Sequence, residues 1–213
     1  MSSANISDGK RHPKNPTMGQ ELQGQLRGCR NVAEGFTAIV RLSTAEAHAK
    51  STTGVHAAVT DTGLEQVVTT SLTNPPYPRS VTATAGGTAG DIAAVQVVVE
   101  GTNEAGQFIT ETLPAFTVNT AGTVEGNKAF KTVSKVTIPA HDGLGATTAI
   151  GYGDKIGLSH YLSQDTVLFA FLNHVQEVTS PTVVADTDEL EKNTCLLDSA
   201  LAGTVVDIYY IVG

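Results

Sequence analysis

The fold of this chain is decided by residues 91–139, which read DIAAVQVVVEGTNEAGQFITETLPAFTVNTAGTVEGNKAFKTVSKVTIP. Three short runs within it, residues 92–100, 107–113 and 130–138, are rich in Val, Ile, Thr and Phe. Each run is followed by turn-forming Gly, Asn or Pro residues, as is typical of strands. The stretch therefore predicts neighbouring strands of an antiparallel layer.

The same texture continues on both sides of this stretch. Further candidate strands lie at residues 64–72, 79–84, 147–150, 166–172, 182–185 and 204–212. Nine short strands separated by Gly, Pro and Asn are typical of a sandwich or barrel. No helical pattern of 10 to 15 residues alternates with them, which argues against a parallel α/β sheet. The predicted fold class is all-β, an antiparallel β-sandwich or barrel-like domain with an extended N-terminal arm.

Two glycine-containing segments are expected to bend the chain inside this domain. Residues 125–128 (Glu-Gly-Asn-Lys) are expected to form a turn leading into Phe130. Gly151 and Gly153 flank Tyr152 and supply the backbone freedom for a reversal or a bulge.

The domain boundary is expected near residue 60. Residues 1–60 are expected to form an arm with short irregular or helical elements. It begins with a polar segment that contains Pro13 and Pro16, followed by a weak helix over residues 18–30. A strand over 36–42, a capped turn over 43–49 and a linker over 50–63 follow. Residues 61–213 form the β-rich domain, with possible sub-parts at 64–150 and 160–213.

Two strands near the C-terminus are unusually apolar. Val167–Leu172 reads VLFAFL and is apolar on both faces, so we expect it centrally in a sheet or beneath an oligomer contact. The run from Val205 to Val212 should be pinned within a sheet or against a neighbouring subunit.

Charge is divided between the two parts of the chain. The net charge is −8, yet residues 1–30 hold five basic and two acidic residues, a net of +3, which leaves −11 for the other 183 residues. An acidic body argues against a nucleic-acid coat, which needs a cationic face. A basic segment on an acidic body indicates that the segment has its own partner.

The cysteines and the hydropathy of the sequence indicate in which cellular compartment the protein is made. Cys29 and Cys195 lie far apart without metal-ligand spacing, so we expect free thiols and synthesis in a reducing cytoplasm. Residues 1–30 contain no apolar core of a signal peptide, and no apolar run approaches a bilayer span. Neither export by the usual route nor a membrane partner is therefore expected.

Motifs with chemical meaning are weak throughout. The Gly-rich residues 85–90 lack the Gly-Lys-Ser/Thr ending of a phosphate loop. His141 and Asp142 could supply a general base or two metal ligands but have no third ligand at diagnostic spacing. Residues 186–191 gather four carboxylates without the spacing of a calcium loop, and a solvated acidic connector is favoured. We expect no catalytic residue, metal or cofactor.

Five blocks of sequence resemble a group of structural proteins from tailed bacteriophages. They are residues 78–91 (PRSVTATAGGTAGD), 101–112 (GTNEAGQFITET), 126–133 (GNKAFKTV), 153–158 (GDKIGL) and 207–212 (DIYYIV), within a match over residues 74–213. The resemblance implies a non-enzymatic virion component made in the host cytoplasm. A capsid decoration or cement protein on the shell exterior is favoured, bound to the major capsid protein, plausibly as a homotrimer, without direct contact to nucleic acid.

Attachment is expected to reside in the arm. Lys10, Arg11 and Lys14 are candidate electrostatic contacts to the capsid, and Leu22 and Leu26 are candidate apolar anchors. Two alternatives stay open: a tail-tube or head-tail connector subunit, and a receptor- or ligand-binding β-domain with a pocket near His141.

Overall fold

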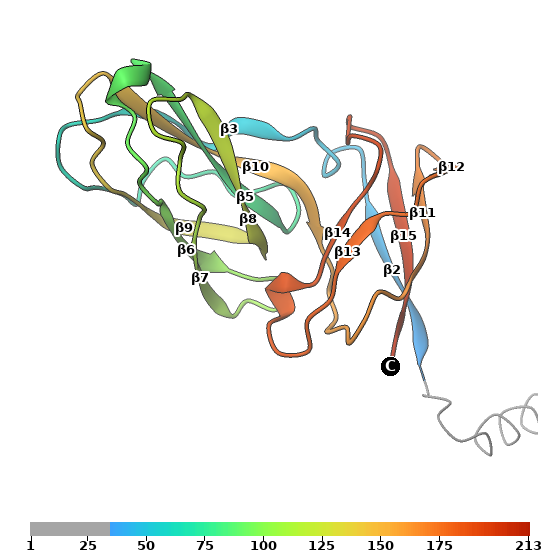
Figure 1. Ribbon diagram of the computed structural model, residues 1–213. Helices are drawn as coiled ribbons and strands as arrows, with labels where there is room; N and C mark the ends of the chain where they lie inside the picture. Colours follow the sequence, from blue (N-terminus) through green and yellow to red (C-terminus); the bar gives the residue numbers. More distant parts are fainter. Residues whose placement is uncertain (1–34) are drawn as a thin grey trace, which may run out of the picture. The chain divides into compact units, whose positions relative to one another are not determined.

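The computed structural model describes residues 35–213, and about half of these residues lie in strands (Figure 1). The chain is all-β with several antiparallel sheets, one of them curled into a half-barrel, which confirms the predicted fold class. The candidate contacts Lys10, Arg11, Lys14, Leu22 and Leu26, and the helix expected over residues 18–30, lie outside the described residues.

Three sheets make up the fold. The first has the order β13 (Thr182–Val184), β14 (Thr194–Leu196), β10 (Ala146–Gly157), β5 (Arg79–Gly87) and β8 (Gly122–Phe130), with β3 (Ser51–Thr60) also paired to β10. The second has the order β12 (Val175–Gln176), β11 (Val167–Leu172), β15 (Val206–Val212) and β2 (Phe36–Leu42). The third has the order β4 (Gln66–Val68), β9 (Thr132–Ile138), β6 (Val98–Thr102) and β7 (Phe108–Thr112). Two 3-10 turns, η1 (Ala89–Asp91) and η2 (Leu190–Lys192), complete the elements.

Residues 37–212 belong to one unit that contains two hydrophobic cores. The first core fills the space between the third sheet and the strands β3, β5, β8 and β10, and includes Val81, Val99, Phe130 and Ile150. The second core lies under the sheet β12-β11-β15-β2 and includes Leu42, Ile156, Leu158, Ile208 and Tyr210. The long strand β10 contributes to both cores.

Strand β10 is bent where it passes from one core to the other. Its pairing with β3 shifts register between Thr148 and Ile150 and between Ile150 and Tyr152, and its pairing with β5 shifts between Tyr152 and Ile156. At the bend, a Cβ on Gly151 would lie 1.8 Å from the carbonyl oxygen of Ser51, so no side chain fits there. The bulge expected around Gly151 and Gly153 is therefore present.

A buried arginine lies at the boundary between the cores. Arg79 at the start of β5 pairs with Ile156 of the second core, while its guanidinium lies 4.8 Å from the centre of the Tyr152 ring in the first core. Its Nη1 donates to the carbonyl oxygen of His48 (2.6 Å) and its Nη2 to Asp154 (3.2 Å). Burial lowers the pKa of Arg79, against the opposing effect of Asp154.

A carboxylate on β7 forms hydrogen bonds to the backbone of β8, which belongs to a different sheet. Glu111 on β7 accepts hydrogen bonds from the backbone N–H groups of Asn127 (2.6 Å) and Lys128 (3.2 Å) on β8. Residues 125–128 lie inside β8 at a register shift, so the turn expected there is wrong: the segment is a bulge whose free N–H groups are satisfied by Glu111.

Other boundaries also differ from the sequence prediction. The linker expected over residues 50–63 is largely strand β3, whose pairing with β10 needs few apolar side chains. The strand expected over residues 92–100 begins only at Val98, because the preceding backbone bonds irregularly to residues 113–119, as in Phe116 N–H to Val95 O and Asn119 N–H to Ile92 O. The strand expected over 64–72 shrinks to Gln66–Val68.

Replacing Arg79 by Ala should destabilise the protein by about 3–5 kcal/mol, because it leaves Asp154 and the His48 carbonyl without a buried partner. Lys50 contacts the same carboxylate but is mostly exposed. Lys50→Ala should therefore cost far less. Urea unfolding followed by circular dichroism measures both, and equal losses would contradict the role given to Arg79.

Glu111 should make stability depend on pH. Burial raises its pKa, against the opposing backbone hydrogen bonds of Asn127 and Lys128. An acid with a raised folded-state pKa costs stability when ionised, and this cost disappears as pH falls through that pKa. Glu111→Gln, which keeps an acceptor oxygen, should therefore be at least as stable as the parent at pH 7, with the advantage shrinking toward pH 4.

The matched variant Glu111→Ala tests the hydrogen bonds rather than the charge. It leaves the N–H groups of Asn127 and Lys128 unpaired and should lower the free energy of unfolding by about 1–3 kcal/mol at every pH. Thermal melts of both variants across this pH range provide the comparison. A Gln variant as unstable as the Ala variant would show that the carboxylate charge is needed.

Candidate interaction surface

The sheet β12-β11-β15-β2 has one buried face and one open face. Side chains alternate along its strands: Ala38, Val40 and Leu42 of β2, and Val206, Ile208 and Tyr210 of β15, point into the second core. The residues between them point away from it. Alternation of this kind places one side of an antiparallel sheet against solvent.

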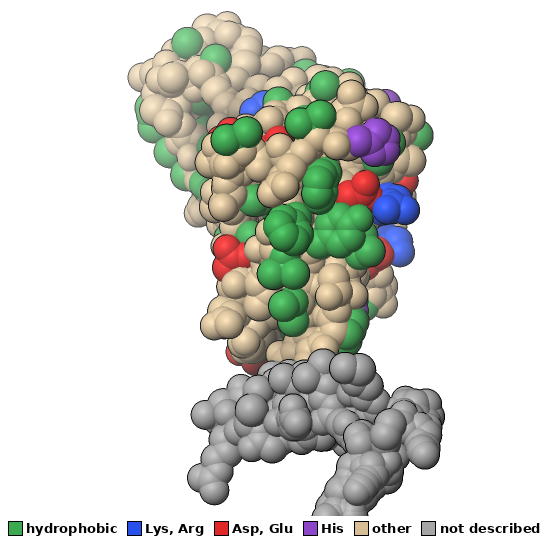
Figure 2. Space-filling model, turned by 90° about the vertical axis from the view of Figure 1, so that its right-hand side faces the viewer, with side chains coloured by type: hydrophobic (Ala, Val, Ile, Leu, Met, Phe, Trp, Pro, Cys, Tyr) green, Lys and Arg blue, Asp and Glu red, His purple; other side chains and the backbone are tan. Residues whose placement is uncertain are grey.

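The open face is apolar and aromatic. We call it the aromatic face and define it as Ile39 on β2, Phe169 and Phe171 on β11, and Tyr209 and Ile211 on β15. Phe169 is 49% exposed and Ile39 is 50% exposed, so large apolar side chains are in contact with water. Figure 2 shows hydrophobic side chains gathered in the middle of this side of the molecule.

Its aromatic rings pack against one another across two strands. The ring centres of Phe169 and Phe171 are 6.5 Å apart, and those of Phe171 and Tyr209 are 5.9 Å apart in an edge-to-face arrangement. Cα pairing places Phe169 opposite Tyr209. Such ring pairs fix the side chains in place, so the face presents a preformed surface.

Only two charged residues occur in the four strands of this sheet, and they bind each other. Arg41 on β2 donates from Nε to Asp207 on β15 at 2.5 Å. The hydrogen bond to Asp207 raises the pKa of Arg41 further above its ordinary value. The aromatic face is therefore locally neutral on an acidic body.

His141 is a structural residue. Its Nδ1 accepts from the Ala93 N–H (3.2 Å), which leaves Nε2 to donate to the Thr148 hydroxyl (2.9 Å). Its own N–H donates to Asp61, and its ring packs against Phe116. Both ring nitrogens are thus engaged, and His141 offers no base or ligand to the pocket considered for a ligand-binding domain.

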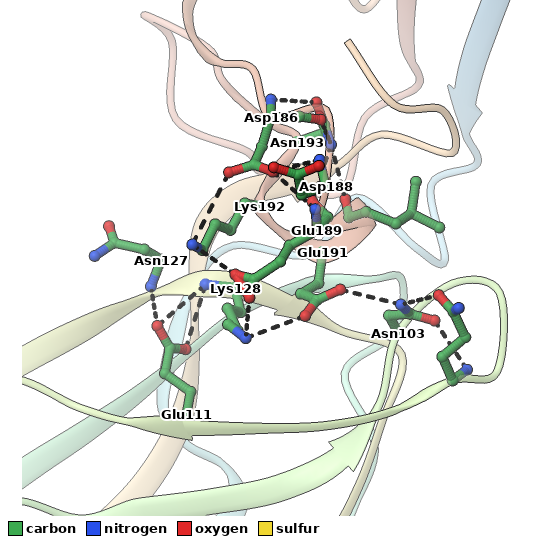
Figure 3. A network of polar contacts seen from close by, with 12 residues as sticks. Asn103, Glu111, Asn127, Lys128, Asp186, Asp188, Glu189, Glu191, Lys192 and Asn193 are labelled. Atoms are coloured by element: carbon green, nitrogen blue, oxygen red, sulfur yellow. Dashed lines mark hydrogen bonds and ion pairs between the residues drawn. The ribbon is translucent and has the colours of Figure 1, made fainter. Parts of the chain in front are cut away.

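The acidic residues 186–191 take part in a polar network (Figure 3). Lys128 Nζ lies 3.1 Å from both Glu189 and Glu191, and Glu191, only 7% exposed, also accepts from the Asn103 amide. Asp186 accepts from the backbone N–H groups of residues 188 and 189. The network joins β8 to η2, so Glu191 departs from the expected solvated connector, while Asp188 and much of Asp186 and Glu189 remain in contact with water.

These carboxylates do not assemble a cation site. Within residues 35–213 no group of three or more His, Cys, Asp or Glu side chains is arranged to hold a metal ion. Cys195 is buried, which raises the pKa of its thiol to about 12. No helix in the described part of the chain is long and apolar enough to span a membrane.

Comparisons with known proteins add no assignment. No protein-family model matches the sequence, and neither curated proteins nor solved structures give a significant match.

The sequence contained part of the signal for the aromatic face. Val167–Leu172 was expected centrally in a sheet or beneath an oligomer contact, and it lies between β12 and β15. The second apolar run is β15, between β11 and β2, as expected for a pinned terminus. The contribution of Ile39 was missed, because the pairing of β2 with β15 joins residues far apart in the sequence.

Lys128→Met should destabilise the protein by roughly 2–4 kcal/mol, because buried Glu191 loses its cation. Lys192→Met, which removes a more exposed partner of Glu189, should change stability little. Chemical unfolding at pH 7 compares the two. Millimolar calcium should leave the melting temperature of the parent protein unchanged, and a rise would contradict the network described here.

Proposed function

We propose that this chain is a non-enzymatic structural protein of a tailed-phage virion, most plausibly a capsid decoration protein that bridges capsomers as a homo-oligomer. The observation that carries the proposal is the aromatic face, a preformed apolar surface whose exposed side chains lie side by side on one sheet. Contiguous exposed apolar surface marks a site of interaction with another macromolecule. This surface supports a binding or structural role for the chain.

The virion role is supported by the sequence blocks that resemble phage structural proteins. Several of these blocks form the structural frame: residues 78–91 contain β5 and η1, residues 153–158 contain the end of β10, and residues 207–212 lie in β15. The resemblance therefore includes strands that contribute to both cores. The resemblance itself does not separate a shell protein from a tail-tube or connector subunit. The distribution of charge along the chain favours the shell.

That division fits attachment to the outside of a shell. An acidic body is repelled by packaged DNA, while the +3 segment at residues 1–30 is free to pair with acidic groups of a capsid protein. Several weak contacts made together by arm and body give avidity. The added contacts across capsomer boundaries would offset the outward pressure of the genome.

Removing the arm charges should abolish attachment without unfolding the body. Replacing Lys10, Arg11 and Lys14 by Gln should lower binding to purified viral shells at least about tenfold, because each cation near an acidic surface contributes to association. Deletion of residues 1–30 should have at least the same effect. Co-sedimentation with shells measures binding, and circular dichroism checks the fold.

A matched control removes the same charge elsewhere. Lys131, Lys135 and Lys192 are exposed in the body, and their replacement by Gln gives the same change in net charge. This control should keep shell binding within about twofold. Full binding by the arm variants, or absence of the chain from purified particles by mass and immunogold labelling, would overturn the proposal.

A further inference from the structure

We infer that the aromatic face binds the same face of a second copy of this chain, sheet against sheet, about a two-fold axis. The inference goes beyond the proposed virion role and does not depend on it, because it concerns the protein in solution. Its basis is the composition and geometry of the sheet β12-β11-β15-β2.

Charge permits a second copy to approach at this face. Residues 31–213 carry a net charge of −11, so two copies repel each other over most orientations. In the four strands of this sheet the only charges are Arg41 and Asp207, which neutralise each other. Two acidic bodies can therefore approach here with reduced repulsion.

The face is also complementary to itself. A two-fold contact requires one patch to match its own copy. An apolar ridge of Phe169, Phe171 and Tyr209 beside one neutral Arg41–Asp207 pair meets this condition when the axis is perpendicular to the line joining the two charges, because that rotation places Arg41 of one copy opposite Asp207 of the other. A partner of single charge sign would instead leave one member of that pair facing a like charge.

The shape of the face is that of one half of a sandwich. Sheets pack face to face about 10 Å apart with interleaved side chains, and a second copy offers the same twist and spacing. The first core of this protein is built in this way, between the third sheet and β5, β8 and β10. The aromatic face repeats that arrangement with no second layer from the described residues over it.

The size of the face sets the strength of the contact. Strands β2, β11 and β15, about 4.8 Å apart and about 22 Å long, together with the two-residue β12, cover roughly 350 Å² per copy. Two copies would bury about 700 Å², which is less than stable specific complexes bury, so the dimer should be weak and reversible, with a dissociation constant on the order of 100 micromolar. The aromatic residues at its centre should contribute most of the binding energy.

Sedimentation equilibrium of the full chain, without particles, tests the inference at concentrations below and above the expected dissociation constant. The mass should rise from one copy toward two. Phe169→Glu adds a charge to each side of the contact and should weaken dimerisation at least about tenfold. Phe108→Glu adds the same charge on β7, at a side chain 66% exposed in a different sheet, and should leave dimerisation unchanged.

Thermal melts of dilute samples confirm that both variants fold, since both side chains are exposed. A chain that stays at one-copy mass, a three-copy mass, or equal loss from Phe169→Glu and Phe108→Glu would overturn the inference. Loss of shell binding by Phe169→Glu in a chain that never dimerises would identify the shell as the occupant instead. Shell binding is measured separately, so failure of the virion role leaves this result readable.

Discussion

The fold depends on a guanidinium that cannot lose its charge and cannot reach water. Arg79 is completely buried at the point where the first core ends and the second begins, and its Nε has no hydrogen-bond partner among the described residues. Such a group is tolerated only where its remaining donors are well paired. The pairing requires the His48 carbonyl, Asp154 and the face of Tyr152 together, which fixes the start of β5, the bend of β10 and the segment before β3 in one arrangement.

A second polar junction acts in parallel with the first. Lys128 on β8 binds Glu189 and Glu191 beside η2, and Asn103 after β6 holds Glu191 from the other side. Both junctions link the strands around the first core to the segments that frame the second. Because polar pairs have stricter geometry than apolar contacts, they restrict how the segments at the boundary of the two cores can be arranged. The aromatic face is then ordered before it binds, which reduces the entropy lost on association.

The sequence predicted those parts of the fold in which side-chain chemistry and strand pairing agree. Val167–Leu172 and the C-terminal run were identified because both are apolar enough to mark strands by composition alone. Strand β3 was missed because its residues are mostly Ser, Thr, Ala and Gly, and only Val55 is deeply buried; its place comes from backbone pairing with β10. The hydrogen bond between Lys128 and Glu191 joins residues 63 positions apart in the sequence. No local sequence pattern predicts it, because it depends on the tertiary fold.

The aromatic face is best understood by comparison with the solvated sheet of the same chain. On the outer side of β6 and β9, Glu100 pairs with Lys135 at 2.8 Å, and Ser134 and Thr110 lie beside them; exposed apolar Phe108 and Val67 are single side chains on the edge strands β7 and β4. The outer side of β11 and β15 carries Phe169, Phe171, Tyr209 and Ile211 at the equivalent alternating positions. The same protein therefore has one open sheet face that is mainly polar and one that is mainly apolar. Since polar residues satisfy strand geometry equally well, the aromatic composition is not required by folding, and contact with another surface is the physical condition under which it lowers the free energy.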